Sequence, residues 1–464
     1  MKNFSTKTEL LPHQVDAANK LLPPRVGGLF ADMGTGKTRM VIELIYRRQK
    51  KIDKVVYFCP VSLKQTVSRE IQKHTDAEEI YVFDDKTDEN LPEASWYIVG
   101  IESMSSSARV IFSVKKLLTE NTYAIVDESS YIKGHKALRT MRVNRLCQIS
   151  RYRTIMTGTP ISQGVVDLYS QMNFLSPKIL GYNSFYSFAA NHLEYSDRYP
   201  GRVVKSHNTE WIAAKIQPYV YQVTKKECLK LPPKLYSTRY FSLSYDQWHW
   251  YNKVKEDFAD EIEKSIDDGY LTSIAIFRMF TALQQISSGF IRWKGEFHEL
   301  SNPRVDQLVD TALSIKDKMI IFAKFQYDVD QIVSALSGEG CVSWFDGRKN
   351  EKQREEAVEH FRSDCRFLVT TQSTGGHGFN FQDITKYTVF YNNSFKYSER
   401  IQAEDRTHRI GQAERPTYIS LFSDSGIDKR IESSLTRKED TAEAFREEVN
   451  RVKKDNLKEL IKKL

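Results

Sequence analysis

The chain has 464 residues, 40% of them hydrophobic and 28% charged, and 68 Lys and Arg against 60 Asp and Glu give a formal net charge of +8. This composition is typical of a globular protein and excludes a disordered or fibrous chain. The mean hydropathy is −0.51, and no apolar run is long enough to cross a bilayer, so we expect no membrane segment. The basic excess permits contact with a polyanion without requiring it.

The N-terminus and the cysteines indicate the compartment. The opening sequence MKNFSTKTEL has no apolar stretch of the kind found in secretory signals. Five cysteines are scattered without a C-x-x-C pair or a Cys/His cluster, at Cys59, Cys147, Cys228, Cys341 and Cys365. We therefore expect reduced thiols in a cytoplasmic protein, with neither a disulfide framework nor a zinc module.

Short apolar runs alternate with helical patterns in both halves of the chain. The predicted strands are 26–30, 55–59, 96–99, 123–127 and 154–157 in the first half, and 319–323, 341–345, 367–371, 387–391 and 417–422 in the second. Apolar runs of this length between polar turns predict strands buried on both faces, and intervening helices predict parallel sheets. The fold class is therefore α/β, with two lobes that are each a parallel sheet flanked by helices.

A stretch at 178–301 separates the two sets of strands and reads mainly as helix and loop, with many aromatic residues. We expect most of these aromatics to be core, although they could also form a stacking platform for a splayed strand. Two adjacent prolines, Pro232 and Pro233, end any helix and favour an extended connector. The predicted domains are 1–232, with its core ending near 177; 233–440, with a helical entry to about 300; and an amphipathic helix at 441–464. The apolar positions of that last helix are Phe445, Val449, Val452, Leu457 and Ile461.

The strongest chemical signal is ADMGTGKT at 31–38, directly after a predicted strand. Glycines let backbone N–H groups curl around a phosphate, and the next helix adds positive potential at its N-terminus. Lys37 is placed to reach the β- and γ-phosphates and Thr38 to bind Mg²⁺. A glycine-rich turn without a ligand is the competing interpretation, and the flanking strand and helix argue against it.

A phosphate loop needs an acidic partner on another strand. Asp127 and Glu128 close the predicted strand at 123–127 and would hold Mg²⁺ and activate the attacking water, respectively. On its own such a pair is usually a helix cap or a solvated turn. Thr157 and Thr159, which flank a glycine after the next strand, are suited to a hydrogen-bonded relay from the nucleotide site.

Two arginines near the end of the second half complete the pattern. Arg406 and Arg409 are three residues apart, so we expect them on one face of a helix. Two guanidiniums on one face can clamp phosphate oxygens, as an arginine finger does. A surface pair bridged to Glu404 or Asp405 is the alternative.

Together these residues resemble the Swi/Snf-type branch of the superfamily two helicase-like ATPases, in order and over nearly the whole chain. The matching segments are 11–14 (glutamine motif), 31–38 (motif I), 57–63 (Ia), 99–103 (Ib), 127–130 (II), 156–160 (III), 320–325 (IV), 370–380 (V) and 402–412 (VI). The segment 231–234 matches the connector between the lobes of that branch. Motif II departs from the branch in Ser129-Ser130, where Ala-His is more usual, which leaves the coupling contact of that histidine open.

The resemblance implies two RecA-like lobes that close on ATP, with ATP and Mg²⁺ as cofactors. It implies catalytic roles for Lys37, Asp127, Glu128, Arg406 and Arg409, metal binding by Thr38 and Asp127, and coupling by Thr157 and Thr159. The implied nucleotide contacts are Gln14, Ala31, Asp32, Met33, Gly34, Thr35, Gly36, Lys37, Thr38, Gly378 and Gln402. The implied nucleic-acid contacts are Pro60, Ser62, Lys64, Ser103, Lys324, Thr371 and Thr374.

The resemblance also implies the activity. We expect a compact, monomeric, bacterial or phage-type DNA translocase or helicase that acts on branched DNA such as forks and Holliday junctions. Two alternatives stay open: a duplex translocase that displaces bound proteins without separating strands, and a nucleotide-gated DNA-binding clamp. DNA-stimulated ATP turnover separates a motor from a clamp, and forked against blunt duplex separates a helicase from a translocase.

Overall fold

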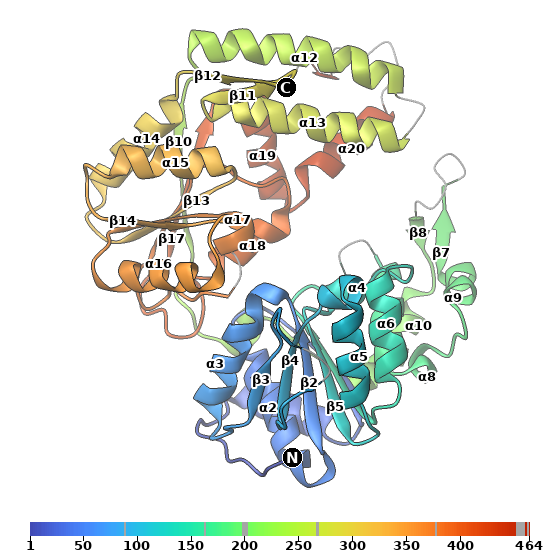
Figure 1. Cartoon of the computed structure of the whole chain (residues 1–464). Coiled ribbons are helices and arrows are strands. Elements are labelled where there is room, and N and C mark those ends of the chain that lie inside the picture. Colours follow the sequence, from blue (N-terminus) through green and yellow to red (C-terminus); the bar gives the residue numbers. More distant parts are fainter. Residues whose placement is uncertain are drawn as a thin grey trace. The chain divides into compact units, whose positions relative to one another are not determined.

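The computed structural model of the chain (Figure 1) describes residues 1–87, 90–161, 164–196, 203–265, 269–375, 378–451, 460–461 and 464. It divides into two compact units, Met1–Lys230 (unit 1) and Leu231–Leu464 (unit 2). Gly376 and His377 of motif V, and Val452 and Leu457 of the predicted terminal helix, lie outside the described residues.

Unit 1 is built on a parallel sheet with the strand order β3-β4-β2-β5-β6-β1-β9. These strands are β1 (Val26–Ala31), β2 (Lys54–Cys59), β3 (Ile80–Val82), β4 (Trp96–Gly100), β5 (Thr122–Asp127), β6 (Tyr152–Thr157) and β9 (Val220–Val223). A separate antiparallel hairpin is formed by β7 (Leu193–Tyr195) and β8 (Val203–Ser206). Since β5, β6 and β1 are neighbours, the segments that follow them meet at one edge of the sheet.

Helices cover the two faces of this sheet, and an apolar core lies under each face. They are α1 (Pro12–Leu21), α2 (Lys37–Arg48), α3 (Lys64–His74), α4 (Ser103–Ser106), α5 (Ala108–Leu117), α6 (Leu138–Cys147), α7 (Val166–Leu175), α8 (Pro177–Leu180), α9 (Phe185–His192), α10 (Thr209–Ile216) and α11 (Lys225–Cys228). Short 3-10 turns lie at Gln49–Lys51, Val61–Leu63, Ser129–Ile132 and Gln217–Tyr219.

Unit 2 has a second parallel sheet with the order β10-β17-β16-β13-β15-β14. Its strands are β10 (Leu235–Phe241), β13 (Met319–Ala323), β14 (Val342–Phe345), β15 (Phe367–Thr371), β16 (Tyr387–Phe390) and β17 (Thr417–Ser423), and β11 (Phe290–Trp293) and β12 (Glu296–Glu299) form a hairpin. Its helices are α12 (Tyr245–Ser265), α13 (Gly269–Ser287), α14 (Pro303–Ser314), α15 (Gln326–Leu336), α16 (Glu351–Ser363), α17 (Gln372–Gly375), α18 (Tyr397–Glu404), α19 (Gly426–Arg437) and α20 (Thr441–Arg451).

The predicted fold class is confirmed, and the ten predicted strands form at their predicted places to within two residues at either end. The stretch at 178–301 differs from the prediction, because it holds strands as well as helices. Its β9 joins the sheet of unit 1 beside β1, and its β10 joins the sheet of unit 2 beside β17. Both are edge strands, with part of their side chains exposed, so they lack the continuous apolar run that marks a central strand.

The cysteine prediction is wrong for one pair. Cys341 and Cys365 form a disulfide with a Cα–Cα distance of 4.4 Å. Each cysteine precedes one of two neighbouring strands, β14 and β15, whose pairing brings the two residues together; spacing along the chain does not reveal this. Cys59, Cys147 and Cys228 are free thiols, as expected. Within the described ranges no helix has the length and apolar character needed to span a membrane.

Candidate functional site

The loop at 31–38 connects the end of β1 to the first turn of α2, as a phosphate loop requires. Gly34 and Gly36 adopt left-handed backbone conformations, with φ of 79° and 83°, which a glycine reaches without steric cost. The Lys37 ammonium donates to the carbonyl of Ala31 at 2.8 Å and to that of Asp32 at 3.4 Å. Its charge therefore lies inside the curl of the loop, together with the N–H groups at the start of α2.

The predicted adenine contact Gln14 lies against this loop. The carboxamide accepts from the backbone N–H of Leu11 at 3.0 Å and donates to the carbonyl of Thr35 at 3.2 Å. A Cβ atom on Gly36 would lie 2.3 Å from Gln14 Nε2, so Gln14 would have to move if another residue stood there. His13 also contacts the Thr35 carbonyl, at 2.9 Å. One end of the Gln14 amide therefore caps α1 at Leu11, and the other end supports the loop at Thr35.

The rest of the loop is tied to its surroundings through Asp32. The Asp32 carboxylate accepts from the backbone N–H of Lys225, at the start of α11, at 2.8 Å. The Thr35 hydroxyl donates to the Asp32 carbonyl at 2.8 Å. Asp32 and Thr35 thus hold the shape of the loop, and the Asp32 carboxylate ties the loop to the start of α11.

The two predicted metal ligands, Thr38 and Asp127, meet at a residue that the sequence did not single out. The Tyr57 hydroxyl, from β2, donates to Asp127 Oδ2 at 3.1 Å and is also hydrogen-bonded to the Thr38 side chain. Burial raises the pKa of Asp127, and the positive charge of Lys37 opposes that shift. The Thr38 hydroxyl and the Asp127 carboxylate offer two oxygen ligands at one place, and Mg²⁺ prefers oxygen ligands. The residues present therefore suit the metal that the motif implies.

Glu128, the predicted base, has an unusual backbone. Its φ of 50° and ψ of 59° are left-handed, which is uncommon for a residue with a Cβ. Non-glycine residues in such conformations cluster at functional sites, where the surrounding structure maintains them. The Thr157 hydroxyl, at the end of β6, lies 3.5 Å from Glu128 Oε2, and the backbone N–H of Thr159 donates to that hydroxyl at 3.1 Å. The two predicted coupling threonines therefore lie beside the predicted base.

A second link between motifs II and III runs through Gln171 of α7, which sequence reasoning missed. Ser129 Oγ donates to Gln171 Oε1 at 2.6 Å, and Gln171 Nε2 donates to the carbonyl of Pro160 at 2.8 Å. Gln171 lies 42 residues from Ser129 and is wholly buried, so no local pattern marks it. The altered residue of motif II is thus joined to motif III through one buried amide.

The predicted nucleic-acid contacts of unit 1 gather at one sheet edge. Pro60, Ser62 and Lys64 follow β2, Ser103 begins α4 just after β4, and β2 and β4 pair in parallel with Cys59 opposite Gly100. The Val61 backbone N–H donates to Glu102 Oε2 at 3.0 Å, which joins the two segments. The Lys64 ammonium donates to the Phe83 carbonyl at 2.5 Å. Its charge therefore lies against the backbone that follows β3.

The corresponding residues of unit 2 also share an edge, because Ala323 at the end of β13 pairs with Thr371 at the end of β15. Thr371 is hydrogen-bonded to Thr374 at 3.0 Å. Lys324 differs from the prediction. Its ammonium donates to Gln284 Oε1 at 2.5 Å and lies 3.1 Å from the centre of the Phe395 ring, and burial lowers its pKa well below the usual value. A charge enclosed in this way is not presented to a polynucleotide.

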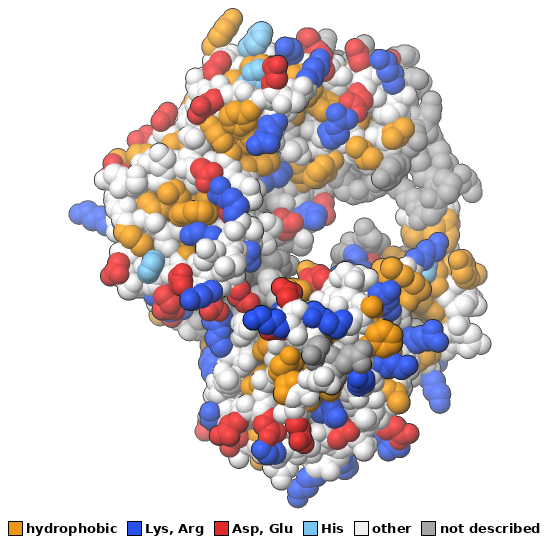
Figure 2. Space-filling view, in the orientation of Figure 1, with side chains coloured by type: hydrophobic (Ala, Val, Ile, Leu, Met, Phe, Trp, Pro, Cys, Tyr) orange, Lys and Arg blue, Asp and Glu red, His pale blue; other side chains and the backbone are white. Residues whose placement is uncertain are grey.

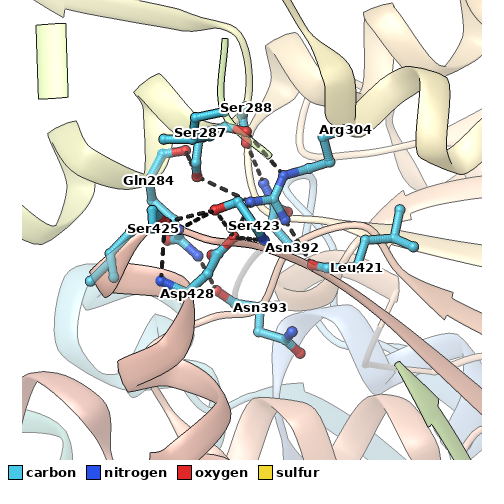
Figure 3. Close-up of polar contacts among 12 residues, drawn as sticks. Gln284, Ser287, Ser288, Arg304, Asn392, Asn393, Leu421, Ser423, Ser425 and Asp428 are labelled. Atoms are coloured by element: carbon cyan, nitrogen blue, oxygen red, sulfur yellow. Dashed lines mark hydrogen bonds and ion pairs between the residues drawn. The ribbon is translucent and has the colours of Figure 1, made fainter. Parts of the chain in front are cut away.

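Lys324 belongs to a buried polar network that joins the motifs of unit 2. The network contains Gln284 and Ser287 of α13, Arg304 of α14, Asn392 and Asn393 after β16, Ser423 of β17 and Asp428 of α19 (Figure 3). Arg304 is fully buried and donates to Asp428 Oδ2 at 2.6 Å, to the Tyr391 carbonyl at 2.6 Å and to the Leu421 carbonyl at 3.0 Å. The Asn393 carbonyl accepts from Gln284 at 2.6 Å.

Motif VI is anchored to this network through Arg400 of α18, which donates to Asn393 Oδ1 and to Glu404 Oε1, each at 2.8 Å. Glu404 Oε2 also accepts from Lys234 at 2.8 Å and from Tyr236 at 2.9 Å. The connector predicted from the two prolines therefore packs on motif VI.

Arg406 and Arg409 do not lie on a helical face, contrary to the prediction. The helix α18 ends at Glu404, and both arginines lie in the turns that follow. Beyond Glu404 the chain forms turns, and the Glu404 carbonyl accepts from the Tyr418 hydroxyl of β17 at 2.9 Å as well as from the Thr407 hydroxyl and the His408 backbone. Arg406 donates to the Phe379 carbonyl at 3.3 Å, and Arg409 is bonded to the Asn380 side chain. The turn therefore places both guanidiniums beside motif V. Gly378 of that motif has a φ of 92°. Gln402 lies one turn before Arg406 and is half-buried.

Comparison with known proteins places the chain in a family. The model of the SNF2-related domain matches residues 15–288, and that of the helicase conserved C-terminal domain matches 303–411. The ATP-dependent helicase MG018 of Mycoplasma genitalium is 25% identical over 94% of this chain, and yeast ISWI chromatin-remodeling complex ATPase ISW1 is 24% identical over 93%. Human DNA annealing helicase and endonuclease ZRANB3 is 24% identical over 93%.

The chain spans 42%, 40% and 40% of the length of these three relatives, respectively. Among solved structures, the Sulfolobus solfataricus SWI2/SNF2 ATPase core in complex with dsDNA is similar, with 21% identity and a TM-score of 0.45; the match covers 99% of this chain and 98% of that one. The SNF2-related match alone covers more than half of the residues. The chain therefore belongs to the SNF2-related domain family, with a helicase conserved C-terminal domain after the SNF2-related part.

Proposed function

We propose that the chain is a DNA-dependent ATPase that couples ATP hydrolysis to movement along DNA or to its remodelling. The observation that carries the proposal is the cluster in unit 1 of Lys37, Thr38, Asp127 and Glu128, on the loops after β1 and β5. These groups supply a cation for phosphates, two oxygen ligands for a metal and a carboxylate base, which is the set that phosphoryl transfer to water uses.

Each residue has a distinct part in this proposal. Lys37 and the N–H groups of the loop bind the phosphates, Thr38 and Asp127 hold Mg²⁺, and Glu128 takes the proton of the attacking water. Mg²⁺ would neutralise charge on the phosphates when bound. Arg406 and Arg409 of unit 2 would stabilise the charge that develops during transfer, so hydrolysis depends on both units. Thr157, which contacts Glu128, and Gln171, which joins Ser129 to Pro160, would couple motif II to motif III.

The substrate is proposed to be DNA, with branched structures such as forks or Holliday junctions preferred. Support comes from the family match and from the similarity to human ZRANB3, a DNA annealing helicase and endonuclease. The grouping of Pro60, Ser62 and Ser103 at one sheet edge suits contacts to a phosphate backbone, which read no sequence. Differential binding of the two nucleotide states is what would drive stepping.

The test is a panel of ATPase measurements with single-stranded, duplex, forked and four-way DNA at one salt concentration. We expect turnover to rise with DNA, most with branched DNA, and to vanish in Lys37→Ala. A Lys51→Ala variant, which removes an exposed cation before β2, is the matched control. An ATPase rate that none of the DNA substrates raises would contradict the proposal. So would ATP turnover that survives in a folded Lys37→Ala protein.

A further inference from the structure

Tyr57 lies in the middle of β2, and the residues on either side of it, from Val55 to Cys59, are apolar. Its side chain is fully buried, in the apolar core that α1, α2 and α3 cover. A buried tyrosine hydroxyl usually finds a hydrogen-bond partner, so a bonded hydroxyl by itself indicates only a packed core residue. Tyr57 is distinguished by which residues its partners are.

The Tyr57 hydroxyl contacts both of the proposed metal ligands. It donates to Asp127 Oδ2 at 3.1 Å and is also hydrogen-bonded to the Thr38 side chain. A phenol has one proton to donate, and an ionised carboxylate only accepts. Since the proton of Tyr57 points to Asp127, the Tyr57 oxygen accepts the proton of the Thr38 hydroxyl. The order of donation is therefore from Thr38 to Tyr57 to Asp127.

This order leaves oxygen lone pairs of both ligands open to a cation. The Thr38 hydroxyl directs its proton to Tyr57, so its lone pairs point elsewhere. The Asp127 carboxylate accepts from Tyr57 at Oδ2 and from the Glu128 backbone N–H at Oδ1, the latter at 2.9 Å. An ionised carboxylate has about four acceptor sites, so about two of them stay open. Hydrogen bonds from outer partners orient ligating groups in metal sites in this way.

Loss of the Tyr57 hydroxyl would release both ligands at once. A threonine hydroxyl without a side-chain partner turns to a nearby backbone carbonyl, which would move the Thr38 oxygen. The Asp127 carboxylate would lose the donor at Oδ2 and keep only the Glu128 N–H at Oδ1, so it could rotate. Each change moves an oxygen that the metal needs.

From these contacts we infer that Tyr57 is a positioning residue of the proposed metal site. Its hydroxyl accepts from Thr38 and donates to Asp127, and so keeps lone pairs of both ligands available to one Mg²⁺. Tyr57 acts through these two residues and contacts neither the metal nor the nucleotide. The inference deepens the proposed function and rests on it, since the site needs Mg²⁺ only if it binds a nucleoside triphosphate for hydrolysis.

Tyr123 of β5 offers a matched control. It is fully buried in the same core, and its hydroxyl also makes two hydrogen bonds, to Thr154 and to Arg48, each at 2.9 Å. Because neither tyrosine is exposed, phenylalanine at either position leaves the charged side chains on the surface of unit 1 in place (Figure 2). Tyr57→Phe and Tyr123→Phe therefore remove the same group from the same core and differ in the partners that lose it.

The test measures metal binding by the full chain with equimolar ADP. Free Mn²⁺, which suits the same oxygen ligands as Mg²⁺, is followed by electron paramagnetic resonance, and ADP alone is the blank. We expect Tyr57→Phe to weaken Mn²⁺ binding roughly 10- to 100-fold, as the loss of an outer partner does. Tyr123→Phe should stay within about twofold of the parent, because its hydroxyl shares no partner with the site. Parent-like Mn²⁺ binding by Tyr57→Phe, or equal losses in both variants, would overturn the inference.

Two further measurements separate positioning from a structural role. In EDTA, the affinity of Tyr57→Phe for ADP should stay within about twofold of the parent, because Lys37 and the loop N–H groups hold the phosphates. In the ATPase assay, the Mg²⁺ concentration that gives half the maximal rate should rise roughly 10- to 100-fold, while the rate at saturating Mg²⁺ approaches that of the parent. A rate lowered equally at every Mg²⁺ concentration, with poor ADP binding in EDTA, would show that the hydroxyl serves only the fold.

The same assays distinguish this inference from the proposed function. If DNA raises the turnover of the parent and Tyr57→Phe binds Mn²⁺ like the parent, the role of Tyr57 is wrong and the proposed function stands. If no DNA raises the turnover of the parent but Tyr57→Phe loses Mn²⁺ affinity as expected, the motor proposal is wrong and the role of Tyr57 stands. A parent that binds no Mn²⁺ with ADP would contradict the metal site and the role of Tyr57 together.

Discussion

The two units hold their predicted catalytic groups by different means. In unit 1, Lys37, Asp127 and Thr157 lie at the carboxyl ends of β1, β5 and β6, which are neighbouring strands. In unit 2, Arg406 and Arg409 lie on turns beyond α18, and a buried network of polar side chains fixes that region. The first site is thus a direct consequence of strand order, whereas the second depends on many contacts between segments far apart in the chain.

The largest effect is expected from the turn of unit 2. Arg409→Ala should lower DNA-stimulated turnover by roughly 10³–10⁵-fold, as loss of an arginine finger does. Affinity for ATP should change much less, because the guanidinium acts on charge that develops during transfer. Single-turnover hydrolysis and nucleotide binding measure the two quantities. Arg409→Lys should recover little, since an ammonium lacks the planar fork, and full recovery would argue against bidentate contact.

In unit 1, Glu128→Gln tests the base. The substitution keeps the shape and should lower turnover by roughly 10²–10⁴-fold, with ATP still bound and DNA retained more tightly. Glu120→Gln, an exposed position paired with Arg151, is the matched control. Hydrolysis and DNA retention are followed together. A Glu128→Gln protein that turns over like the parent would place the base elsewhere.

The buried network can be broken at Arg304. Arg304→Met leaves Asp428 buried without its cation, and unfolding free energy should fall by about 3–5 kcal/mol. Arg278→Met removes an exposed pair with Glu261 and should cost at most about 1 kcal/mol. Urea unfolding followed by tryptophan fluorescence measures both. Equal losses in the two variants would show that the network does not stabilise unit 2 more than a surface pair does.

Gln171 of unit 1 tests the link between motifs II and III. Gln171→Leu removes the link from Ser129 to Pro160 and should lower DNA-stimulated turnover roughly 5- to 30-fold, as expected for one or two neutral hydrogen bonds of about 1 kcal/mol each. Gln171→Glu keeps the acceptor for Ser129 and loses the donor to Pro160, so it tells the two bonds apart. ATPase rates with and without DNA are the readout, and an equal fall in both rates would exclude a coupling role.

A further effect concerns the pH dependence of stability in unit 2. Burial raises the pKa of Asp328 from 3.8 to about 6. Because its pKa is raised, the Asp328 carboxyl binds a proton more tightly in the native state than in the unfolded state. The stability that this proton binding adds is present in full below pH 4 and is lost as pH rises through 6. The loss amounts to roughly 2–3 kcal/mol.

Asp328→Asn should remove that dependence. Asp328 Oδ2 accepts from both Asn392 and the Phe325 backbone, and the amide oxygen can take its place. The midpoint of urea unfolding between pH 4 and 7 is the measurement. If Asp328→Asn leaves the slope of midpoint against pH unchanged, Asp328 does not titrate in this range.

The sequence by itself determined the features that depend on neighbours in the chain. The central strands could be predicted because both of their faces are apolar, and the loop at 31–38 because its glycines, lysine and threonine act within one turn. The order of Asp127, Glu128, Thr157 and Thr159 after strands likewise predicted that they would meet, since ends of parallel strands share an edge.

The remaining contacts of the site depend on how distant segments pack together. Tyr57 joins Thr38 to Asp127, and Gln171 joins Ser129 to Pro160, across separations that no periodic pattern marks. The Tyr418 hydroxyl on the Glu404 carbonyl and the Gln284 side chain on Lys324 are contacts with segments far along the chain. A sequence pattern reports the propensity of a segment, whereas the partner of a polar side chain depends on which segments pack beside it.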